Sequence, residues 1–319
     1  MCARIVTEVT AKDSGVTLVM PLRSARGTSA LRLTGAILMY HRVHRTAYDP
    51  WRLCVSPEHF EQHLALLARE NVVPLSALLR TPRGVAITFD DGYFDNLETA
   101  LPLLEKYKLP ATVFVATDIL RGKEFWWDRL EHSLLQIARP ADLAGRIADN
   151  PLFRRARTAA LGARLRSQSP EVLDSLLSEM PNVPPAAAAA CARHRMLNED
   201  ELRTLARSPL IEIGAHTRSH PCLPELDEDL QREEVAGSRD LLRKLTGQSI
   251  CTFTYPYGAH NDTSVRVVQN AGFDLACIVG GGARACTDPF RLPRLMVRDV
   301  NGMAFAAHFR SWKALRWFA

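Results

Sequence analysis

Short apolar runs alternate with amphipathic segments along most of the chain, beginning at residue 36. Continuous runs of this kind, rich in Val, Ile and Phe, are typical of strands that are buried on both faces. The runs that we expect to form strands lie at 36–40, 85–89, 111–116, 210–214, 251–254, 274–279 and 295–300.

Apolar residues recur at helical spacing between these runs. Ser56 and Pro57 predict a helix start, with the serine as the capping residue and the proline in the first turn. Phe60, Leu64 and Leu67 then recur at intervals that place them on one face of that helix. Further helices are expected near residues 97–104, 227–245 and 263–270.

The alternation of strands and helices predicts a parallel sheet, because parallel strands need a crossover connection. We expect this parallel sheet to close on itself, which gives an α/β fold in which a barrel of parallel strands is wrapped by helices. In such a barrel we expect the chemistry on loops at the carboxyl ends of the strands.

The pattern also predicts how the chain is divided. Residues 1–34 show no sustained period and are expected to be a loose N-terminal extension, followed by one barrel domain at 35–319. Within that domain, residues 121–205 are rich in Arg and Ala, lack a convincing strand and predict a helical insertion.

Composition narrows the class of protein. Lys and Arg number 40 against 35 Asp and Glu, and the net charge of +5 is too small to argue for a nucleic-acid partner. The seven cysteines are scattered and never spaced as Cys-x-x-Cys, which favours reduced thiols. We see no export signal and no apolar run of about 18 residues, so we expect a cytoplasmic protein.

The first candidate for chemistry follows the run at 85–89. Asp90 and Asp91 stand side by side before Gly92, which permits a tight turn. Two adjacent like charges are explained if a bound cation takes one carboxylate and leaves the other as a base. A solvated turn is the alternative.

A second candidate follows the run at 210–214. His216 and His220 would face the same way if the segment turned helically, which is the geometry that two imidazoles need to share a metal. Two surface histidines are the alternative. With Asp91 they would form a set of two histidines and one carboxylate that leaves positions open for water and substrate.

The third candidate is the aromatic segment Tyr255-Pro256-Tyr257-Gly258. Such a loop can aim a backbone N–H at a developing oxyanion, and its rings could stack on a sugar. An ordinary turn is the alternative.

The motifs TFDDG (88–92), HTRSH (216–220) and YPYG (255–258), in this order, resemble the three principal motifs of the polysaccharide deacetylase family, carbohydrate esterase family 4, with its NodB homology domain. The resemblance covers roughly residues 36–300 apart from the insertion. It implies a distorted (β/α) barrel that removes N-acetyl groups from amino sugars with a divalent metal, most readily zinc, with cobalt or nickel as alternatives. By position, Asp90 resembles the catalytic base, the Tyr257 N–H the oxyanion donor, and Asp91, His216 and His220 the metal ligands.

Two departures from the family pattern matter. Thr254 stands where members often carry the arginine that orients the base, and we expect Arg291 or Arg294 to supply that charge from a neighbouring strand. The usual late Leu-x-His segment is missing. The early Tyr-His-Arg-Val at 40–43 is similar to a branch of the family with an early histidine, which makes His41 the candidate acid. A histidine that is merely hydrogen-bonded at a strand end is the alternative.

Aromatic residues elsewhere suggest further contacts. Trp126 and Trp127 are candidate sugar-stacking residues, together with Tyr255 and Pro256, although core packing is an alternative for the tryptophans. At the C-terminus, an apolar stripe of Phe305, Phe309, Trp312 and Leu315 among basic residues is compatible with peripheral membrane contact. We favour the alternative of a helix that closes the barrel.

The sequence therefore predicts a metal-dependent N-deacetylase that acts on an N-acetylated sugar in a polysaccharide, glycolipid or sugar-carrier precursor. One alternative is a hydrolase of another linear or cyclic amide that uses the same site. Another is a catalytically inactive barrel that binds carbohydrate.

Overall fold

The computed structural model describes residues 35–46, 49–81, 83–137, 162, 164–165, 172–173, 175, 195–280 and 288–317. The predicted extension at 1–34 and most of the predicted insertion at 121–205 lie outside the described residues. The division of the chain into extension, barrel and insertion therefore stays a prediction.

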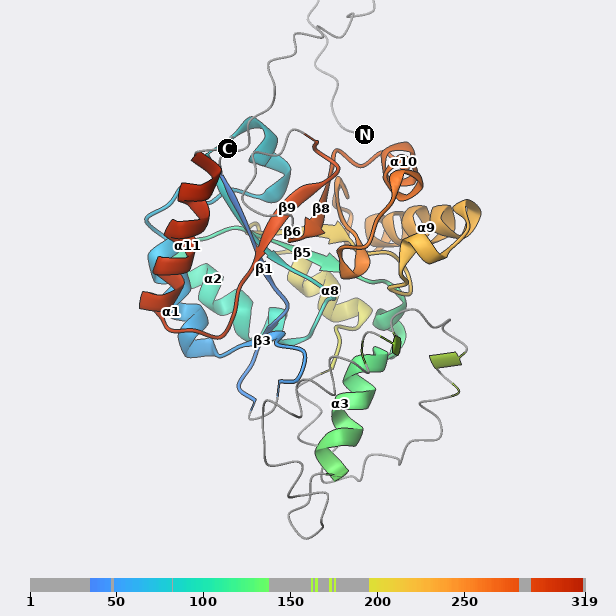
Figure 1. Cartoon of the computed structure of the whole chain (residues 1–319), viewed down its shortest axis with the longest axis horizontal. Helices are drawn as coiled ribbons and strands as arrows, with labels where there is room; N and C mark the ends of the chain where they lie inside the picture. Colours follow the sequence, from blue (N-terminus) through green and yellow to red (C-terminus); the bar gives the residue numbers. More distant parts are fainter. Residues whose placement is uncertain are drawn as a thin grey trace, which may run out of the picture.

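Seven parallel strands close into a barrel, as predicted (Figure 1). In their order around the barrel they are β1 (Ala36–Tyr40), β4 (Val85–Phe89), β5 (Ala111–Val115), β6 (Ile211–Ala215), β7 (Thr252–Thr254), β8 (Leu275–Val279) and β9 (Leu292–Met296). β1 pairs along its whole length with β4 but through only two residues with β9, and β6 pairs with β7 through one residue pair, so the barrel is irregular.

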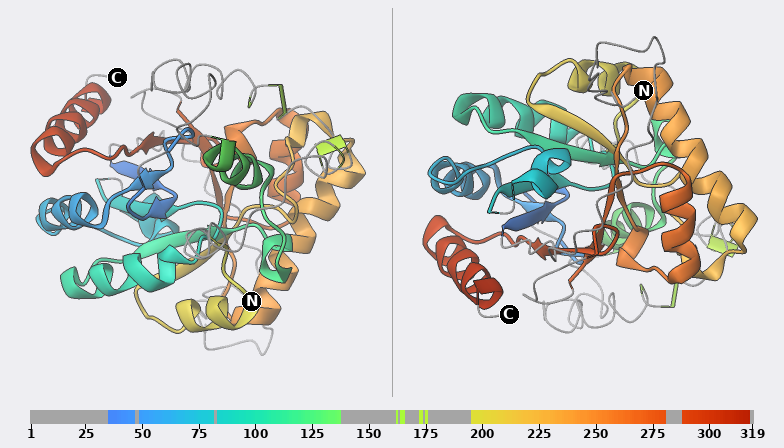
Figure 2. Two further views of the ribbon diagram at one scale, coloured as in Figure 1. Left: turned by 90° about the horizontal axis from the view of Figure 1, so that it is seen from below. Right: turned by 90° about the horizontal axis from the view of Figure 1, so that it is seen from above.

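Helices surround the strands. Figure 2 shows α1, α2 and α11 on one side of the barrel and α9 and α10 on the opposite side. Every residue of β1, β4 and β5 is buried, because each strand is covered by the barrel interior on one face and by helices on the other. The helices are α1 (Pro57–Leu67), α2 (Leu101–Tyr107), α3 (Trp126–Ile137), α8 (Glu199–Ala206), α9 (Glu228–Thr246), α10 (Asp262–Asn270) and α11 (Gly302–Trp317).

Several short elements connect these strands and helices. A two-stranded parallel pair stands next to the barrel, and a single π-helical turn precedes α2. The short elements are β2 (Arg42–Val43), β3 (Cys54–Val55), η1 (Leu75–Arg80), η2 (Asn96–Ala100), η3 (Asp118–Arg121), η5 (Leu223–Glu225) and η6 (Pro256–Gly258).

The last strand differs from its prediction. β9 spans Leu292–Met296 instead of 295–300, so it includes Pro293 and Arg294. A proline lacks the N–H of a strand ladder, and a buried arginine needs a charged partner, so the local pattern argued against a strand here. The partner of Arg294 is Asp90 at the end of β4, which no pattern within β9 reveals.

The start of α1 also differs in one detail. Ser56 occupies the capping position, but its side chain makes no cap hydrogen bond. Its N–H and hydroxyl both donate to Asp299 Oδ1, at 3.0 and 2.8 Å. Asp299 follows β9, so a residue distant in sequence adds a negative charge at this helix N-terminus, next to Glu58 of the first turn.

The C-terminal helix α11 packs against α1. Membrane contact by the apolar stripe would require Phe305 and Phe309 to be exposed. Both side chains are instead buried in the core. The packing favours the role of a helix that closes the barrel. None of the described helices is both long enough and apolar enough to cross a bilayer.

Candidate active site

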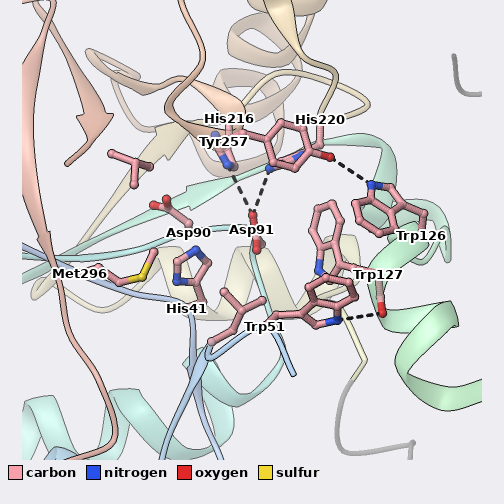
Figure 3. Close-up of a pocket in the computed structure, with 12 residues that line it drawn as sticks. His41, Trp51, Asp90, Asp91, Trp126, Trp127, His216, His220, Tyr257 and Met296 are labelled. Atoms are coloured by element: carbon pink, nitrogen blue, oxygen red, sulfur yellow. Dashed lines mark hydrogen bonds and ion pairs between the residues drawn. The ribbon is translucent and has the colours of Figure 1, made fainter. Parts of the chain in front are cut away.

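A cavity of about 180 Å³ lies at the carboxyl ends of the strands. Its polar lining comes from three loops: His41 follows β1, the pair Asp90 and Asp91 follows β4, and the pair His216 and His220 follows β6 (Figure 3). These residues meet because parallel strands end at the same rim of a barrel. The rest of the lining is aromatic or aliphatic: Trp51, Leu53, Trp126, Trp127, Tyr257, Val279 and Met296.

The three predicted metal ligands converge on one point. Asp91 Oδ1 lies 3.4 Å from Nε2 of His216 and 3.4 Å from Nε2 of His220. One ligand atom from each residue lies within 4.8 Å of the other two, and all three side chains are buried. The arrangement places two imidazole nitrogens and one carboxylate oxygen around a shared position.

The two histidines do not converge through a helical turn, so that prediction was wrong. The segment from His216 to His220 is a loop in which Thr217 (φ 65°) and His220 (φ 62°) have left-handed backbone conformations. The Thr217 hydroxyl accepts a hydrogen bond of 3.1 Å from the His220 N–H and holds the loop in this shape. A positive φ is costly for residues with a Cβ atom, so the loop stores backbone strain at the site.

His216 is oriented by a hydrogen bond on its far side. Its Nδ1 lies 2.8 Å from the carbonyl oxygen of Thr254. A carbonyl oxygen can only accept, so Nδ1 carries a proton, and Nε2 is the ring nitrogen on the side of Asp91.

His220 is oriented by aromatic rings instead. Its Nδ1 is buried and has no hydrogen-bond partner among the described residues. The ring packs edge to face against Phe125, Trp127 and Tyr257, at centroid distances of 5.2, 4.9 and 4.6 Å. The position of this imidazole therefore depends on the packing of three neighbouring side chains.

Asp90 has a separate partner. Its two carboxylate oxygens each accept a hydrogen bond of 2.6 Å from Arg294, and all of these groups are buried. Arg294 also donates to the Thr254 hydroxyl at 2.7 Å, so the guanidinium reaches the residue that stands in place of the expected arginine. Arg291, the other candidate, pairs instead with Asp288 and Asp262.

Both carboxyl groups are ionised although they are buried. Burial alone would raise the pKa of Asp90, but the Arg294 guanidinium holds that pKa below its ordinary value. Burial would likewise raise the pKa of Asp91, and the imidazoles of His216 and His220 hold it below its ordinary range. The adjacent acids thus have the separate environments that allow them separate roles.

His41 faces the same cavity. Its ring makes no hydrogen bond to another described residue, so the alternative of a hydrogen-bonded structural histidine is not supported. Its backbone carbonyl accepts a hydrogen bond of 2.9 Å from Asn96 Nδ2, and the Val43 N–H donates to Asp95 Oδ1 at 3.1 Å. Burial lowers the pKa of His41, although the neighbouring carboxylates oppose this effect.

The aromatic loop after β7 provides Tyr257 to the cavity. Tyr257 has φ 58° and ψ 4°, and its hydroxyl accepts a hydrogen bond of 3.1 Å from Trp126 Nε1. Tyr255 is fully buried and donates its hydroxyl to the Phe290 carbonyl, and neither it nor Pro256 lines the cavity. The expectation that Tyr255 and Pro256 contact the sugar is therefore corrected, because the ring of this loop that lines the cavity is that of Tyr257.

Three tryptophans form a wall beside Tyr257. Trp126 and Trp127 were predicted to lie here, whereas Trp51 was not. Trp51 Nε1 donates to the Trp127 carbonyl at 3.2 Å, and the rings of Trp51 and Trp126 pack edge to face at 5.5 Å. Trp51 lies in a segment without periodicity, so its presence in an otherwise polar stretch was the only available signal.

A buried polar network supports this wall and was also missed. Trp127 Nε1 donates to the Tyr93 hydroxyl at 2.9 Å, and Tyr93 donates to Asp128 at 3.0 Å. Arg42 lies 3.6 Å from Asp128 and 3.5 Å from Glu131. Burial raises the pKa of Glu131 to about 7. A pattern of apolar positions cannot identify such residues, because it assigns acids and arginines to the surface.

Comparison with known sequences points to one class of protein. The family model described as polysaccharide deacetylase matches residues 80–152 and 166–276. The chain is also 22% identical over 289 residues to YxkH of Bacillus subtilis (strain 168), whose name marks it as a provisional polysaccharide deacetylase. That match covers 87% of this chain and 76% of YxkH.

Solved structures show the same barrel. The deacetylase PplD of Streptococcus pyogenes, in complex with acetate, is similar with a TM-score of 0.58 and 20% identity, over 86% of this chain and 96% of PplD. A de-N-acetylase from Aggregatibacter actinomycetemcomitans is similar with a TM-score of 0.55 and 14% identity, over 86% of this chain and 98% of that protein. At these identities the similarity shows the fold alone.

Proposed function

Because the chain belongs to the polysaccharide deacetylase family, we propose that it hydrolyses the N-acetyl group of an amino sugar with the help of a divalent metal ion. The observation that carries the proposal is the meeting of Asp91, His216 and His220 beside the Arg294-paired Asp90. Family membership supports deacetylation of a carbohydrate. The need for a metal ion and the choice of an amino sugar as substrate go beyond family membership and are part of the proposal.

The donor set fits zinc. Ligand atoms at 2.0–2.2 Å from a common tetrahedral centre are about 3.4 Å apart, and Asp91 Oδ1 lies at that distance from both imidazole nitrogens. The Thr254 carbonyl behind His216 is the outer partner that metal-binding histidines usually have. A divalent ion held there would polarise the acetyl carbonyl and make a water molecule more acidic.

Asp90 is placed to act as the base. Arg294 keeps its carboxylate ionised and fixes both oxygens, so the group enters the reaction with a set orientation. In the proposed step it accepts a proton from the water that attacks the acetyl carbon. Attack produces a tetrahedral oxyanion, and the left-handed Tyr257 backbone is the candidate donor of a stabilising N–H.

His41 is placed to act as the acid. An amine is a poor leaving group, so the C–N bond breaks readily only when the nitrogen receives a proton. His41 lines the cavity together with Asp90 and Asp91, and the charges of these carboxylates favour its protonated form although burial lowers its pKa. The products are acetate and the free amino sugar, in which the amine nitrogen carries the proton from His41.

The aromatic wall of Trp51, Trp126, Trp127 and Tyr257 is suited to a sugar ring, because aromatic faces pack on the C–H faces of pyranoses. The proposed partner is therefore an N-acetylated sugar in a polysaccharide, a glycolipid or a sugar-carrier precursor. The cytoplasmic location stays a prediction.

The test is metal analysis combined with acetate release. The purified chain is analysed for bound metal, stripped with a chelator, reloaded with zinc, cobalt or nickel, and assayed on nucleotide-linked, lipid-linked and oligomeric N-acetyl sugars. We expect acetate release only from metal-loaded protein. Acetate release that survives complete removal of metal would contradict the proposed role of the ion.

Two other outcomes would identify the alternatives. Ring opening of a cyclic ureide without acetate release from any sugar would indicate a hydrolase of another amide. Tight binding of an N-acetyl sugar by the metal-loaded protein without turnover would indicate an inactive carbohydrate-binding barrel.

A further inference from the structure

Glu234 of α9 receives three hydrogen bonds from the loop that connects His216 with His220. Its Oε2 accepts from the N–H groups of Arg218 and Ser219 at 2.8 and 2.9 Å. Its Oε1 accepts from the Ser219 hydroxyl at 2.7 Å. Both oxygens of one partly buried carboxylate are therefore bonded to the loop that carries two of the proposed metal ligands.

The loop is shaped to bind such a carboxylate. Two successive backbone N–H groups that point at one oxygen form a concavity that favours a negative charge. Thr217, with φ 65°, turns the backbone immediately before the two donors. Glu234 supplies the negative charge from a helix that follows the loop in the chain. The backbone of the loop and the side chain of α9 are therefore complementary.

The segment at the start of η3 holds the same loop through backbone hydrogen bonds. The Thr117 N–H donates to the Thr217 carbonyl at 3.2 Å, and the Asp118 N–H donates to the Arg218 carbonyl at 2.8 Å. Arg218 is thus bound through its N–H to Glu234 and through its carbonyl to Asp118. Left-handed residues persist where their surroundings enforce them, and two separate segments do so here.

The two histidines depend on this loop to different degrees. The His216 ring has its own anchor, because its Nδ1 lies 2.8 Å from the Thr254 carbonyl oxygen. The buried Nδ1 of His220 has no hydrogen-bond partner among the described residues. The His220 N–H donates to the Thr217 hydroxyl within the loop, at 3.1 Å. The position of His220 therefore depends on the shape of the loop as well as on the aromatic rings around it.

We propose that Glu234 is a positioning residue that fixes the loop in the shape that binds the metal ion, an inference that rests on the proposed function. Its three hydrogen bonds form when the chain folds, so the ligands are arranged before an ion arrives. Without them, the N–H groups of Arg218 and Ser219 turn to water and the loop is free to relax its left-handed residues. His220 Nε2 then leaves its place beside Asp91, and the ion has to order the loop on binding.

The first test measures zinc affinity by competition with a chromophoric chelator, which does not depend on turnover. Glu234→Ala removes all three hydrogen bonds and should raise the zinc dissociation constant at least about tenfold, as loss of an outer partner does. Glu233→Ala is the matched control, because it removes the same charge from the exposed neighbouring position of α9. Its zinc dissociation constant should stay within about twofold of that of the unmodified protein, since an exposed charge is screened.

Two further variants separate contact from charge. Glu234→Gln loses the charge but keeps an oxygen for both N–H groups and an amide that can donate to the Ser219 hydroxyl, so zinc affinity should stay within about threefold. Glu234→Asp keeps the charge on a side chain that is one methylene shorter, so the bonds lengthen and affinity should fall at least about fivefold. The comparison of the Gln and Asp variants does not require Glu234→Ala to fold.

The second test measures amide hydrogen exchange in the metal-free protein. In Glu234→Ala the N–H groups of Arg218 and Ser219 should exchange at least about tenfold faster than in the unmodified protein, because their acceptor is gone. The N–H groups within β5 should exchange at unchanged rates. This pattern would show that Glu234 orders the loop before metal binds.

The inference is overturned if Glu234→Ala binds zinc as tightly as the unmodified protein, or if both Ala variants lose the same affinity. It is also overturned if Glu234→Asp keeps full affinity while Glu234→Gln loses it, because the charge alone would then explain the effect.

Failure of the proposed function looks different. If no N-acetyl sugar releases acetate but zinc affinity still follows the Glu234 variants as expected, the proposed reaction is wrong and the role of Glu234 stands. If the unmodified protein binds no zinc, cobalt or nickel, both the proposed metal site and the role of Glu234 are rejected.

Discussion

Asp90 and Asp91 are neighbours in the chain, yet each has its own partner in the barrel. Asp90 is clamped by Arg294, whereas Asp91 faces His216 and His220. The chain turns directly after β4, because Asp91 has a left-handed backbone with φ 77°, and the two side chains therefore leave the strand end in different directions. A single Asp-Asp pair can therefore serve a base and a metal ligand at the same time.

Substitutions of Asp90 and of His216 should separate metal binding from catalysis. Asp90→Asn should keep bound zinc and lose at least about a hundredfold in kcat, because an amide cannot take the proton. His216→Ala should lose both zinc and activity. Elemental analysis and acetate release measure the two effects, with Asp274→Asn on the exposed surface as the control. A fully active Asp90→Asn protein would reject the assignment of the base.

The buried Asp90–Arg294 pair should also dominate local stability. Arg294→Gln leaves a buried carboxylate without its cation and should lower the free energy of unfolding by about 3–5 kcal/mol. Adding Asp90→Asn should restore part of that loss, because the unpaired charge is then gone. Denaturant unfolding measures both variants. Arg291→Gln, whose pair with Asp288 is partly exposed, should change stability by less than about 1 kcal/mol.

At the scale of elements, the aromatic wall depends on contacts between β2, the segment before η2 and α3. Tyr93 joins them: its hydroxyl accepts from Trp127 and donates to Asp128, and Asp128 lies beside Arg42. Trp127 in turn packs on His220. A buried network outside the cavity therefore helps to position one of the proposed metal ligands.

Removal of one hydroxyl tests that connection. Tyr93→Phe leaves the Trp127 N–H without a partner and removes a hydrogen bond to Asp128, and it should destabilise the fold by about 1–3 kcal/mol. Because Trp127 supports His220, we expect zinc affinity to fall by about tenfold, as after loss of an outer partner. Competition with a chromophoric chelator measures the affinity. Tyr107→Phe, whose hydroxyl bonds Glu61 on α1, should leave zinc affinity unchanged, and an equal loss in both variants would contradict the connection.

At the scale of the whole molecule, the barrel closes where β9 meets β1 and α11 packs on α1. His63 of α1 joins these parts: Nε2 donates to the Val300 carbonyl at 2.7 Å, Nδ1 accepts from the Tyr40 hydroxyl at 3.3 Å, and the ring stacks on Phe305 at 4.1 Å. Burial lowers the pKa of His63 to about 4. The native state therefore holds this imidazole neutral.

This burial makes global stability depend on pH. The unfolded chain binds the His63 proton below about pH 6.5 and the native state only below about pH 4, so stability falls as the pH decreases across that window. The expected loss is about 3 kcal/mol in total. His63→Gln should remove this part of the pH dependence in denaturant unfolding, whereas His308→Gln on the exposed face of α11 should not. An unchanged pH profile in His63→Gln would contradict the prediction.

Much of the fold was predictable because burial in a parallel barrel produces continuous apolar runs. β1 and β4 lie where their runs predicted, and α9 and α10 follow their helical spacing. The meeting of Asp91 with His216 and His220 was predictable for the same reason, because each follows such a run and parallel strands end at one rim. Local pattern therefore sufficed wherever a residue's environment was set by its own strand or helix.

The remaining features of the fold and the site were decided by contacts between segments that are distant in the sequence. The choice of Arg294 over Arg291, the register of β9, the left-handed loop between His216 and His220, and the place of Trp51 in the wall all depend on contacts between distant segments. A charge pair such as Asp90 with Arg294 leaves no periodic trace in either segment, since its energy depends on the distance between two side chains. Apolar periodicity reports how each segment is buried, whereas the identity of a polar partner is known only once the segments are packed.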